Sequence, residues 1–295
     1  MANITATTGA QWIPVIWSQE TLQAAEFARV LAKLVNRAYE GAIEEMGNTV
    51  RIPHTSNYTA NTKSAGSNLS FEAVTHSKTD LVINAHQYAA FQEEKFAEKQ
   101  MLPNYLSVNT KKLGYALGRA LDVAIGALFP SLSTNVVGTY GVELTDNDYL
   151  SAWQKVVDSG AIQGPGLAEE VATVLSSAAY VAAMKTEKFI NRDYGNDGDA
   201  VTKATVGVIY GTKTYLSLLL NVPSAGQHAC SMFHRNAFAC AVQDGVRMES
   251  DFIIEADATA VAAHQIYGVV TLARPVETAG SASTSDAFAT LLRTV

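Results

Sequence analysis

The chain of 295 residues has few cysteines and no long apolar run. Cys230 and Cys240 are too few for a disulfide framework and fit a reducing cytoplasm, so we expect two inert, buried thiols. The first residues lack a basic stretch followed by an apolar one, and no window reaches about 18 uninterrupted apolar residues. The sequence therefore predicts neither a secretory signal nor a membrane span.

Basic charge is also scarce. The chain carries 21 Lys and Arg against 28 Asp and Glu, a net charge of −7, and no lysine follows Lys213. A dedicated nucleic-acid binder normally has an excess of basic residues. The composition therefore argues against that class, while leaving room for local basic stripes.

The common catalytic and cofactor-binding motifs are missing as well. The chain has no G-x-x-x-x-G-K-S/T, no G-x-G-x-x-G after a strand, no H-E-x-x-H and no G-x-S-x-G. Asp193, Asp197 and Asp199 match only part of a calcium loop, and Cys230 with His234 lacks a second pair for zinc. We therefore predict no catalytic, cofactor or metal site.

One enzyme class stays open as an alternative, an α/β hydrolase-like enzyme. Its triad would join Ser224 and Asp244 to either His228 or His264. Separation along the chain does not exclude such a triad, but no nucleophile motif supports it.

The clearest periodic pattern is a long amphipathic segment, residues 104–129. Pro103 precedes it and Pro130 follows it, so the pattern predicts one spine helix of about 24 residues, or roughly 36 Å. We expect its apolar stripe to pack under strands at 81–91 and 267–274. The stripe contains Leu113, Leu117, Leu121 and Leu128.

Three glycines, Gly114, Gly118 and Gly126, lie inside this predicted helix. Glycine in a helix costs up to about 1 kcal/mol relative to alanine. We interpret the glycines as positions at which the helix can bend, and close packing against the strands is the alternative explanation.

The N-terminal part combines an apolar arm with a predicted helix. Trp12 and Trp17 belong to an apolar cluster too short for a helix, which must be covered either by its own domain or by a neighbouring subunit. A helix is expected to begin at Ser18. Its apolar stripe contains Phe27, Leu31, Leu34, Val35 and Ala38.

The opposite face of this helix carries a predicted basic ridge. Arg29, Lys33 and Arg37 stand at i, i+4 and i+8, so on a helix they would line up one turn apart. Such a ridge is either a solvated surface or a contact for a polyanion.

Residues 55–70 form a polar stretch in which ten of sixteen positions are Ser, Thr or Asn. Strand-like segments at 49–53 and 81–91 bracket it, which predicts a long extended hairpin with a polar tip. A hairpin alone is at best marginally stable in water. We therefore expect this one to lie against another part of the structure.

The middle of the chain predicts a compact α/β unit of roughly 90 residues. Thr145 and Asp148 match a capping box, which starts a helix ending at Gly160. The elements expected next are a strand at 171–175, a helix at 177–192, and strands at 206–210 and 214–220. The final strand is expected at 267–274, closed by Pro275.

Four short segments accompany this order of parts: Lys185–Tyr194 (KTEKFINRDY), Gly207–Gly211 (GVIYG), Phe233–Phe238 (FHRNAF) and Tyr267–Pro275 (YGVVTLARP). Together with that order, they resemble the major capsid protein of tailed double-stranded DNA bacteriophages, the Hong Kong 97 fold. The resemblance implies an α+β fold with an N-terminal arm, an extended hairpin loop, a peripheral domain holding the spine helix, and an α/β axial domain. The implied boundaries are 1–47 for the arm and first helix, 48–78 for the loop, 79–131 with 229–295 for the peripheral domain, and 132–228 for the axial domain.

The family implies a structural protein and not an enzyme. Its subunits self-assemble into hexamers and pentamers of an icosahedral shell around packaged double-stranded DNA. The implied partners are other copies of the chain, a scaffolding protein, a portal and, non-specifically, the DNA, with no membrane. The implied locations are the virion and, during assembly, the host cytoplasm. A same-fold cellular nanocompartment shell stays open as an alternative.

The resemblance assigns the hairpin loop to contacts with a neighbouring subunit. The loop side chains expected there are Tyr58, Lys63, Leu69 and Phe71. The namesake of the fold also joins its subunits by a Lys–Asn isopeptide bond, but no Asn follows Asn236 in this chain. We therefore expect no self-crosslinking.

The resemblance also gives roles to the N-terminal residues. Trp12 and Trp17 would make arm contacts, while Arg29, Lys33 and Arg37 would face the packaged genome or scaffold on the shell interior. The sequence has no long N-terminal helical extension, so control of assembly is expected from a separate scaffolding protein or from a propeptide already removed.

Overall fold

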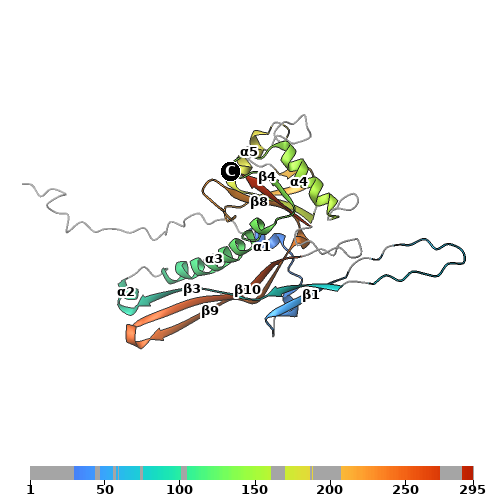
Figure 1. Ribbon diagram of the computed structural model, residues 1–295. Coiled ribbons are helices and arrows are strands. Elements are labelled where there is room, and N and C mark those ends of the chain that lie inside the picture. Colours follow the sequence, from blue (N-terminus) through green and yellow to red (C-terminus); the bar gives the residue numbers. More distant parts are fainter. Residues whose placement is uncertain are drawn as a thin grey trace, which may run out of the picture.

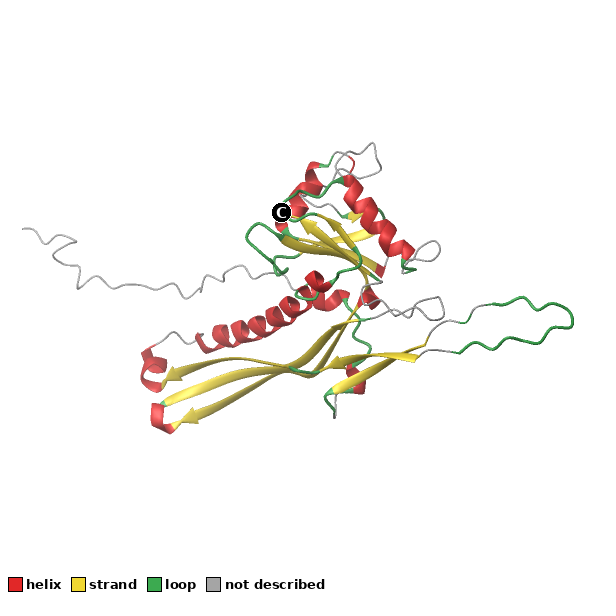
Figure 2. Cartoon of the chain, in the orientation of Figure 1, coloured by secondary structure: helices red, strands yellow, loops and turns green. Residues whose placement is uncertain are grey.

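The computed structural model of the chain describes residues 30–43, 47–55, 58, 60–73, 76–100, 105–160, 170–186, 188, 207–272 and 288–294. Trp12, Trp17, Arg29 and the partial calcium loop at 193–199 lie outside the described residues. The described elements form three sheets and one long helix (Figure 1, Figure 2).

The first part is a six-stranded sheet in the order β4-β11-β8-β5-β7-β6. Its strands are β4 (Val136–Gly138), β5 (Val171–Leu175), β6 (Val208–Ile209), β7 (Thr212–Leu216), β8 (His228–His234) and β11 (Ala289–Thr294). Helices α4 (Asp146–Asp158) and α5 (Ser177–Lys185) pack against it. The main hydrophobic core fills the space between this sheet, these helices and the C-terminal end of the long helix.

Local sequence signals account for the turns and helix starts here. The Asp148 carboxylate accepts a hydrogen bond from the backbone N–H of Thr145 at 2.8 Å, which confirms the capping box. Tyr210 and Gly211 join β6 to β7 with φ angles of 47° and 80°. Two successive positive φ values make the two-residue turn that matches the twist of a hairpin.

The second part is a three-stranded antiparallel sheet in the order β3-β10-β9, with the spine helix along one face (Figure 1). The elements are β3 (Ala85–Glu94), β9 (Phe238–Ile253), β10 (Ala258–Thr271) and α3 (Tyr105–Gly126). Leu113 and Leu117 of α3 cluster with Val261 and Ala263 of β10, and the Tyr267 hydroxyl donates to the carbonyl of Ala120 at 3.3 Å. The long helix is therefore confirmed, and so is its packing on this sheet for Leu113 and Leu117 of the predicted stripe.

The third part is the predicted hairpin, formed by β1 (Thr49–Thr55) and β2 (His76–Val82). These strands pair along their whole length. At the base of the hairpin, Ile52, Leu81 and Ile83 share a small core with Ala239 and Leu272. There β2 crosses β10 so closely that a Cβ at Gly268 would lie 2.3 Å from the carbonyl oxygen of Val82. The hairpin thus lies against the rest of the fold, as expected.

Two strand predictions are wrong. The alternating run at 81–91 is divided, because β2 ends at Val82 and β3 begins at Ala85 in a different sheet. The backbone N–H of Ile83 still donates to the carbonyl of Asn48 at 2.8 Å and continues the pairing with β1 by one residue. Ala85 then pairs with Tyr267 of β10, in the other sheet. The strand at 267–274 is the end of the longer β10, and the final strand is β11.

The topology also differs from the predicted boundaries, which place all of 229–295 beside the spine helix. Strands β8 and β11 instead lie within the six-stranded sheet, where β11 pairs in parallel with β4 and antiparallel with β8. Of the described strands from this part of the chain, β9 and β10 lie beside α3, together with β3 from earlier in the sequence. The chain crosses between the two sheets at η6 (Arg235–Ala237).

By length and composition alone, the segment Asn109–Ser131 is apolar enough to cross a membrane. Its apolar side chains Leu113, Leu117 and Leu121 are buried in the fold. Packing against the strands therefore accounts for the composition of this helix.

We expect Leu117→Ala to destabilise the folded chain by about 2 to 5 kcal/mol, because it leaves a cavity in the cluster under α3. Leu117 is 2% exposed, whereas Val123 on the same helix is 45% exposed. The control Val123→Ala should change the free energy of unfolding by no more than about 0.5 kcal/mol. Urea denaturation measures both, and equal effects would contradict the packing described for α3.

Candidate assembly surfaces

A short N-terminal segment, residues 30–43, ties the three parts together, and we call it the strap. Its first turn is α1 (Leu31–Leu34), whose N-cap Val30 has no side-chain capping bond. Asp122 of α3 supplies the cap instead. This fully buried carboxylate accepts hydrogen bonds from the backbone N–H groups of Val30, Leu31 and Ala32 at 2.7, 3.2 and 3.0 Å. It thus satisfies donors that a helix start leaves unpaired.

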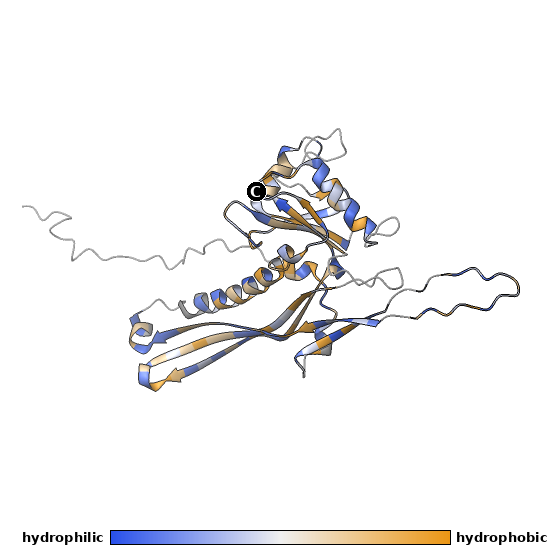
Figure 3. Ribbon diagram, in the orientation of Figure 1, coloured by the Kyte–Doolittle hydropathy of each residue, from blue (hydrophilic) through white to orange (hydrophobic). Residues whose placement is uncertain are grey.

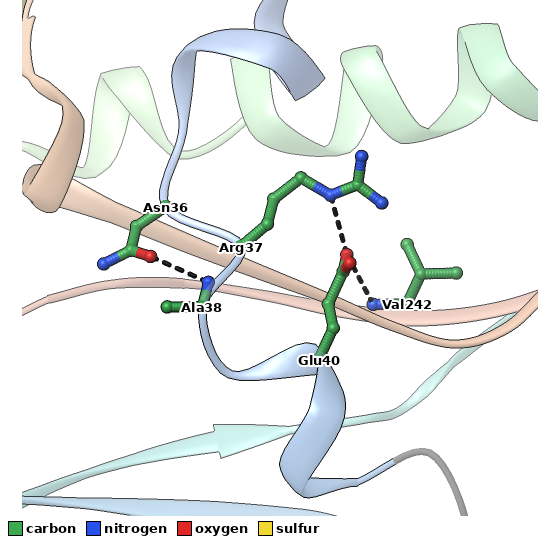
Figure 4. Close-up of polar contacts among 5 residues, drawn as sticks. All are labelled: Asn36, Arg37, Ala38, Glu40 and Val242. Atoms are coloured by element: carbon green, nitrogen blue, oxygen red, sulfur yellow. Dashed lines mark hydrogen bonds and ion pairs between the residues drawn. The ribbon is translucent and has the colours of Figure 1, made fainter.

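The strap then joins the edge of β9. The backbone N–H of Asn36 donates to the carbonyl of Phe238 at 3.0 Å, and the N–H of Cys240 donates to the carbonyl of Asn36 at 2.9 Å. Next, the Glu40 carboxylate accepts from the N–H of Val242 at 3.3 Å (Figure 4). These bonds run from backbone to backbone or from a side chain to the backbone, so they fix the path of the strap along β9.

Beyond η2 (Glu40–Ala42) the strap leads to the hairpin. The Gln243 side-chain amide donates to the carbonyls of Ile43 and Gly47 at 3.1 and 2.9 Å. Ile43 itself is buried in the core at the base of the hairpin. The strap therefore connects the buried end of α3 to β1.

The predicted basic ridge does not form on one helix. Helix α1 ends at Leu34, and Val35 is extended, with φ −92° and ψ 165°. The physical reason is the pairing of Asn36 with β9, which takes the backbone groups that a longer helix would need. Lys33 and Arg37 are both exposed. Arg37 lies 2.7 Å from Glu40 (Figure 4), and this hydrogen bond raises the pKa of the guanidinium.

The predicted contact residues of the hairpin loop are exposed to solvent. Tyr58, Leu69 and Phe71 are large apolar side chains at 73%, 65% and 92% exposure, and Lys63 is exposed as well. The loop extends away from the sheets in Figure 1. No apolar cluster among the described residues includes these side chains, so the described part of the chain gives them no cover.

The spine residues divide between two cores. Leu113 and Leu117 face the three-stranded sheet, and Leu121 joins the main core. Leu128 lies after the end of α3 and packs, partly buried, against the main core. Gly118 is half-buried within α3. Along β10 buried and partly exposed residues alternate from Val261 to Tyr267, and both apolar and polar residues occur on the strands beside the helix (Figure 3).

Close packing explains one of the three spine glycines. A Cβ at Gly126 would lie 3.2 Å from the carbonyl oxygen of Leu219 and 3.5 Å from Cδ1 of Leu31. The strap and the loop before β8 therefore require a small residue there. Bending at Gly114 and Gly118 stays a prediction.

The residues considered for chemistry do not come together. Ser224 lies in a turn before β8, whereas Asp244 and His264 belong to the three-stranded sheet. Within the described ranges no hydrogen bond joins these three side chains, and no group of three metal-binding residues occurs. Cys230 and Cys240 are buried, and burial raises the pKa of each thiol to about 11.

Sequence reasoning missed Asp122, the residue that holds the strap. The helical pattern assigns it to the polar face of α3, where a solvated carboxylate is the ordinary expectation. No local signal pairs it with Val30, because 92 positions separate them.

Comparison with solved structures relates this arrangement to known proteins. A chain from Mycobacterium phage Che8 matches at a TM-score of 0.79 and 20% identity, over 95% of this chain and 97% of that chain. The capsid structure of cyanophage P-SCSP1u matches at a TM-score of 0.75 and 17% identity, over 100% of this chain and 97% of that chain. The mature capsid of bacteriophage PhiM1 matches at a TM-score of 0.73 and 12% identity, over 96% of this chain and 92% of that chain. No protein family and no curated protein matches the chain by sequence.

This chain has the Hong Kong 97-like capsid fold. The α+β class and the resemblance to major capsid proteins of tailed phages are therefore confirmed. Within the capsid fold, α3 is the spine helix and β1 with β2 is the extended hairpin. The likeness spans 95% to 100% of this chain, so it includes the projecting hairpin as well as the sheets.

We expect Asp122→Asn to destabilise the folded chain by about 2 to 3 kcal/mol, because the amide nitrogen cannot accept and leaves N–H groups of the strap unpaired. Hydrogen exchange at Val30, Leu31 and Ala32 should accelerate at the same time. Glu255→Gln, at an exposed carboxylate in η7 (Ile254–Ala256), is the control. Unchanged stability and exchange in Asp122→Asn would show that the cap is dispensable.

Proposed function

We propose that the chain is a major capsid protein of a tailed bacteriophage. It self-assembles into hexamers and pentamers that form an icosahedral shell around packaged double-stranded DNA. The observation that carries this proposal is the likeness over nearly the whole chain to a cyanophage capsid and to the mature capsid of a second phage.

The shape of the subunit supports assembly with other copies. The hairpin loop exposes Leu69 and Phe71, and the far tip between β9 and β10 exposes Ile254 at 84%. Exposed apolar groups on projecting elements mark protein contacts. A loop that buries little also cannot offset roughly 1 to 2 kcal/mol of backbone entropy per residue. Neighbouring subunits would supply the missing cover.

The proposal extends to the other partners and to location. A scaffolding protein would direct assembly, a portal would occupy one vertex, and the DNA would be bound without sequence preference. The protein would act in the virion and assemble in the host cytoplasm.

Negative-stain microscopy and size-exclusion chromatography of the purified chain test the proposal. Closed shells of megadalton size or large capsomers are expected, and a monomer or dimer at all concentrations would contradict it. Shells isolated from uninfected cells that enclose a protein cargo and no DNA would instead indicate a cellular nanocompartment.

The hairpin loop offers the sharpest test of assembly. Deleting residues 57–68, or changing Phe71 to Ser, should leave a folded subunit that fails to form closed shells. Because Phe71 is 92% exposed, its substitution should alter stability by less than about 0.5 kcal/mol. Circular dichroism checks the fold and microscopy checks the shells. Normal shells from both variants would rule out a role for the loop at subunit contacts.

The basic residues of the N-terminal part are expected to contact the genome. Replacing Arg29, Lys33 and Arg37 with Gln should weaken binding of assembled subunits to two unrelated duplexes equally. The salt dependence of binding should also fall, by about 0.9 in the log–log slope for each phosphate that the protein no longer neutralises. Lys63→Gln with Lys78→Gln, in the hairpin, is the matched control. Location of Lys33 and Arg37 on the outer surface of a particle would overturn this assignment.

A further inference from the structure

Helix α3 covers only part of the sheet beneath it. Ala263 of β10 is 0% exposed under the helix, whereas Met248, its direct partner on β9, is 43% exposed. Paired residues on antiparallel strands point to the same face. Phe252, which pairs with Thr259, therefore points the same way as Met248, and it is 44% exposed. Met248 and Phe252, with the small polar Ser250 between them on the same face, form a shelf on β9 beside α3.

The shelf and the strap both contact helix α3. Gly114, Gly118 and Asp122 stand at i, i+4 and i+8 on α3, so they share one row along the helix. At one end of this row, a Cβ on Gly114 would lie 4.0 Å from Cε of Met248. At the other end, Asp122 holds Val30. The two ends are about 12 Å apart along the helix axis.

We propose that the apolar arm cluster between Trp12 and Trp17 docks on the shelf of the same chain. Twelve residues separate Trp17 from Val30, a link that spans roughly 18 Å as a helix and roughly 40 Å when extended. Either length reaches from Asp122 to Met248. A methionine beside tryptophans also gains sulfur–aromatic contacts. This inference concerns the single subunit, so it does not rest on the proposed shell function.

Disulfide trapping tests the contact in the full chain. The double variant Ile16→Cys with Met248→Cys should form an intrachain disulfide in the unassembled subunit under mild oxidation. The matched control pairs Ile16→Cys with Tyr88→Cys. Tyr88 is 69% exposed and pairs with His264, the neighbour of Ala263, so it lies on the opposite face of the same sheet. The first pair should react about tenfold faster than the second, because docking raises the effective concentration.

Mixing single variants separates one chain from two. When Ile16→Cys subunits are mixed with Met248→Cys subunits, few interchain disulfides are expected. Equal rates for the two double variants would overturn the proposal. Cross-links that form only between chains, or only in assembled particles, would also overturn it and would assign the shelf to another copy.

Tryptophan emission provides a second, independent measurement. Trp12 and Trp17 are two of the three tryptophans in the chain, so their release into water should shift the emission to longer wavelength. Met248→Asp should cause that shift while far-UV circular dichroism stays unchanged, and Tyr88→Asp should not. A folded Met248→Asp subunit with unchanged emission would refute docking on the shelf.

Discussion

The buried carboxylate of Asp122 is the contact on which the junction of the three sheets depends. A charge away from water is costly unless hydrogen bonds compensate it, and here three backbone N–H groups do so. The dependence runs both ways. Without the strap, the carboxylate would lose these three hydrogen bonds, and without the carboxylate, the first turn of α1 would have no cap. The two elements are therefore held together or lost together.

From this contact the strap runs along β9 to the base of the hairpin, and its contacts hold the hairpin in place. Asn36 pairs with β9, the Gln243 amide binds the carbonyls of Ile43 and Gly47, and Ile43 enters the core at the hairpin base. The described part of the subunit has three separate apolar clusters, and the two in the projecting parts are small. Thin, extended parts bury little area for each residue that they order, so contacts with other copies suit them better than isolation.

Much of the fold could be predicted where the signal is local. The apolar stripe through Leu113 and Leu117 predicted α3, because helical spacing is set within a few residues. The capping box at Thr145 and the strand at 171–175 were equally local. For the candidate surfaces, the polar composition of residues 55–70 was enough to indicate an exposed loop, with Phe71 at its edge.

By itself, then, the sequence determined the long helix, the start of α4, the hairpin and the capsid-like order of parts. Only the tertiary structure decided that α1 stops before Arg37, that the run at 81–91 divides between two sheets, and that β8 and β11 belong to the six-stranded sheet. In each case the deciding pairing comes from residues distant in sequence, such as Phe238 for Asn36 and Tyr267 for Ala85. Periodicity records which side of an element is apolar, but it does not record which distant backbone will occupy that element's free N–H and C=O groups.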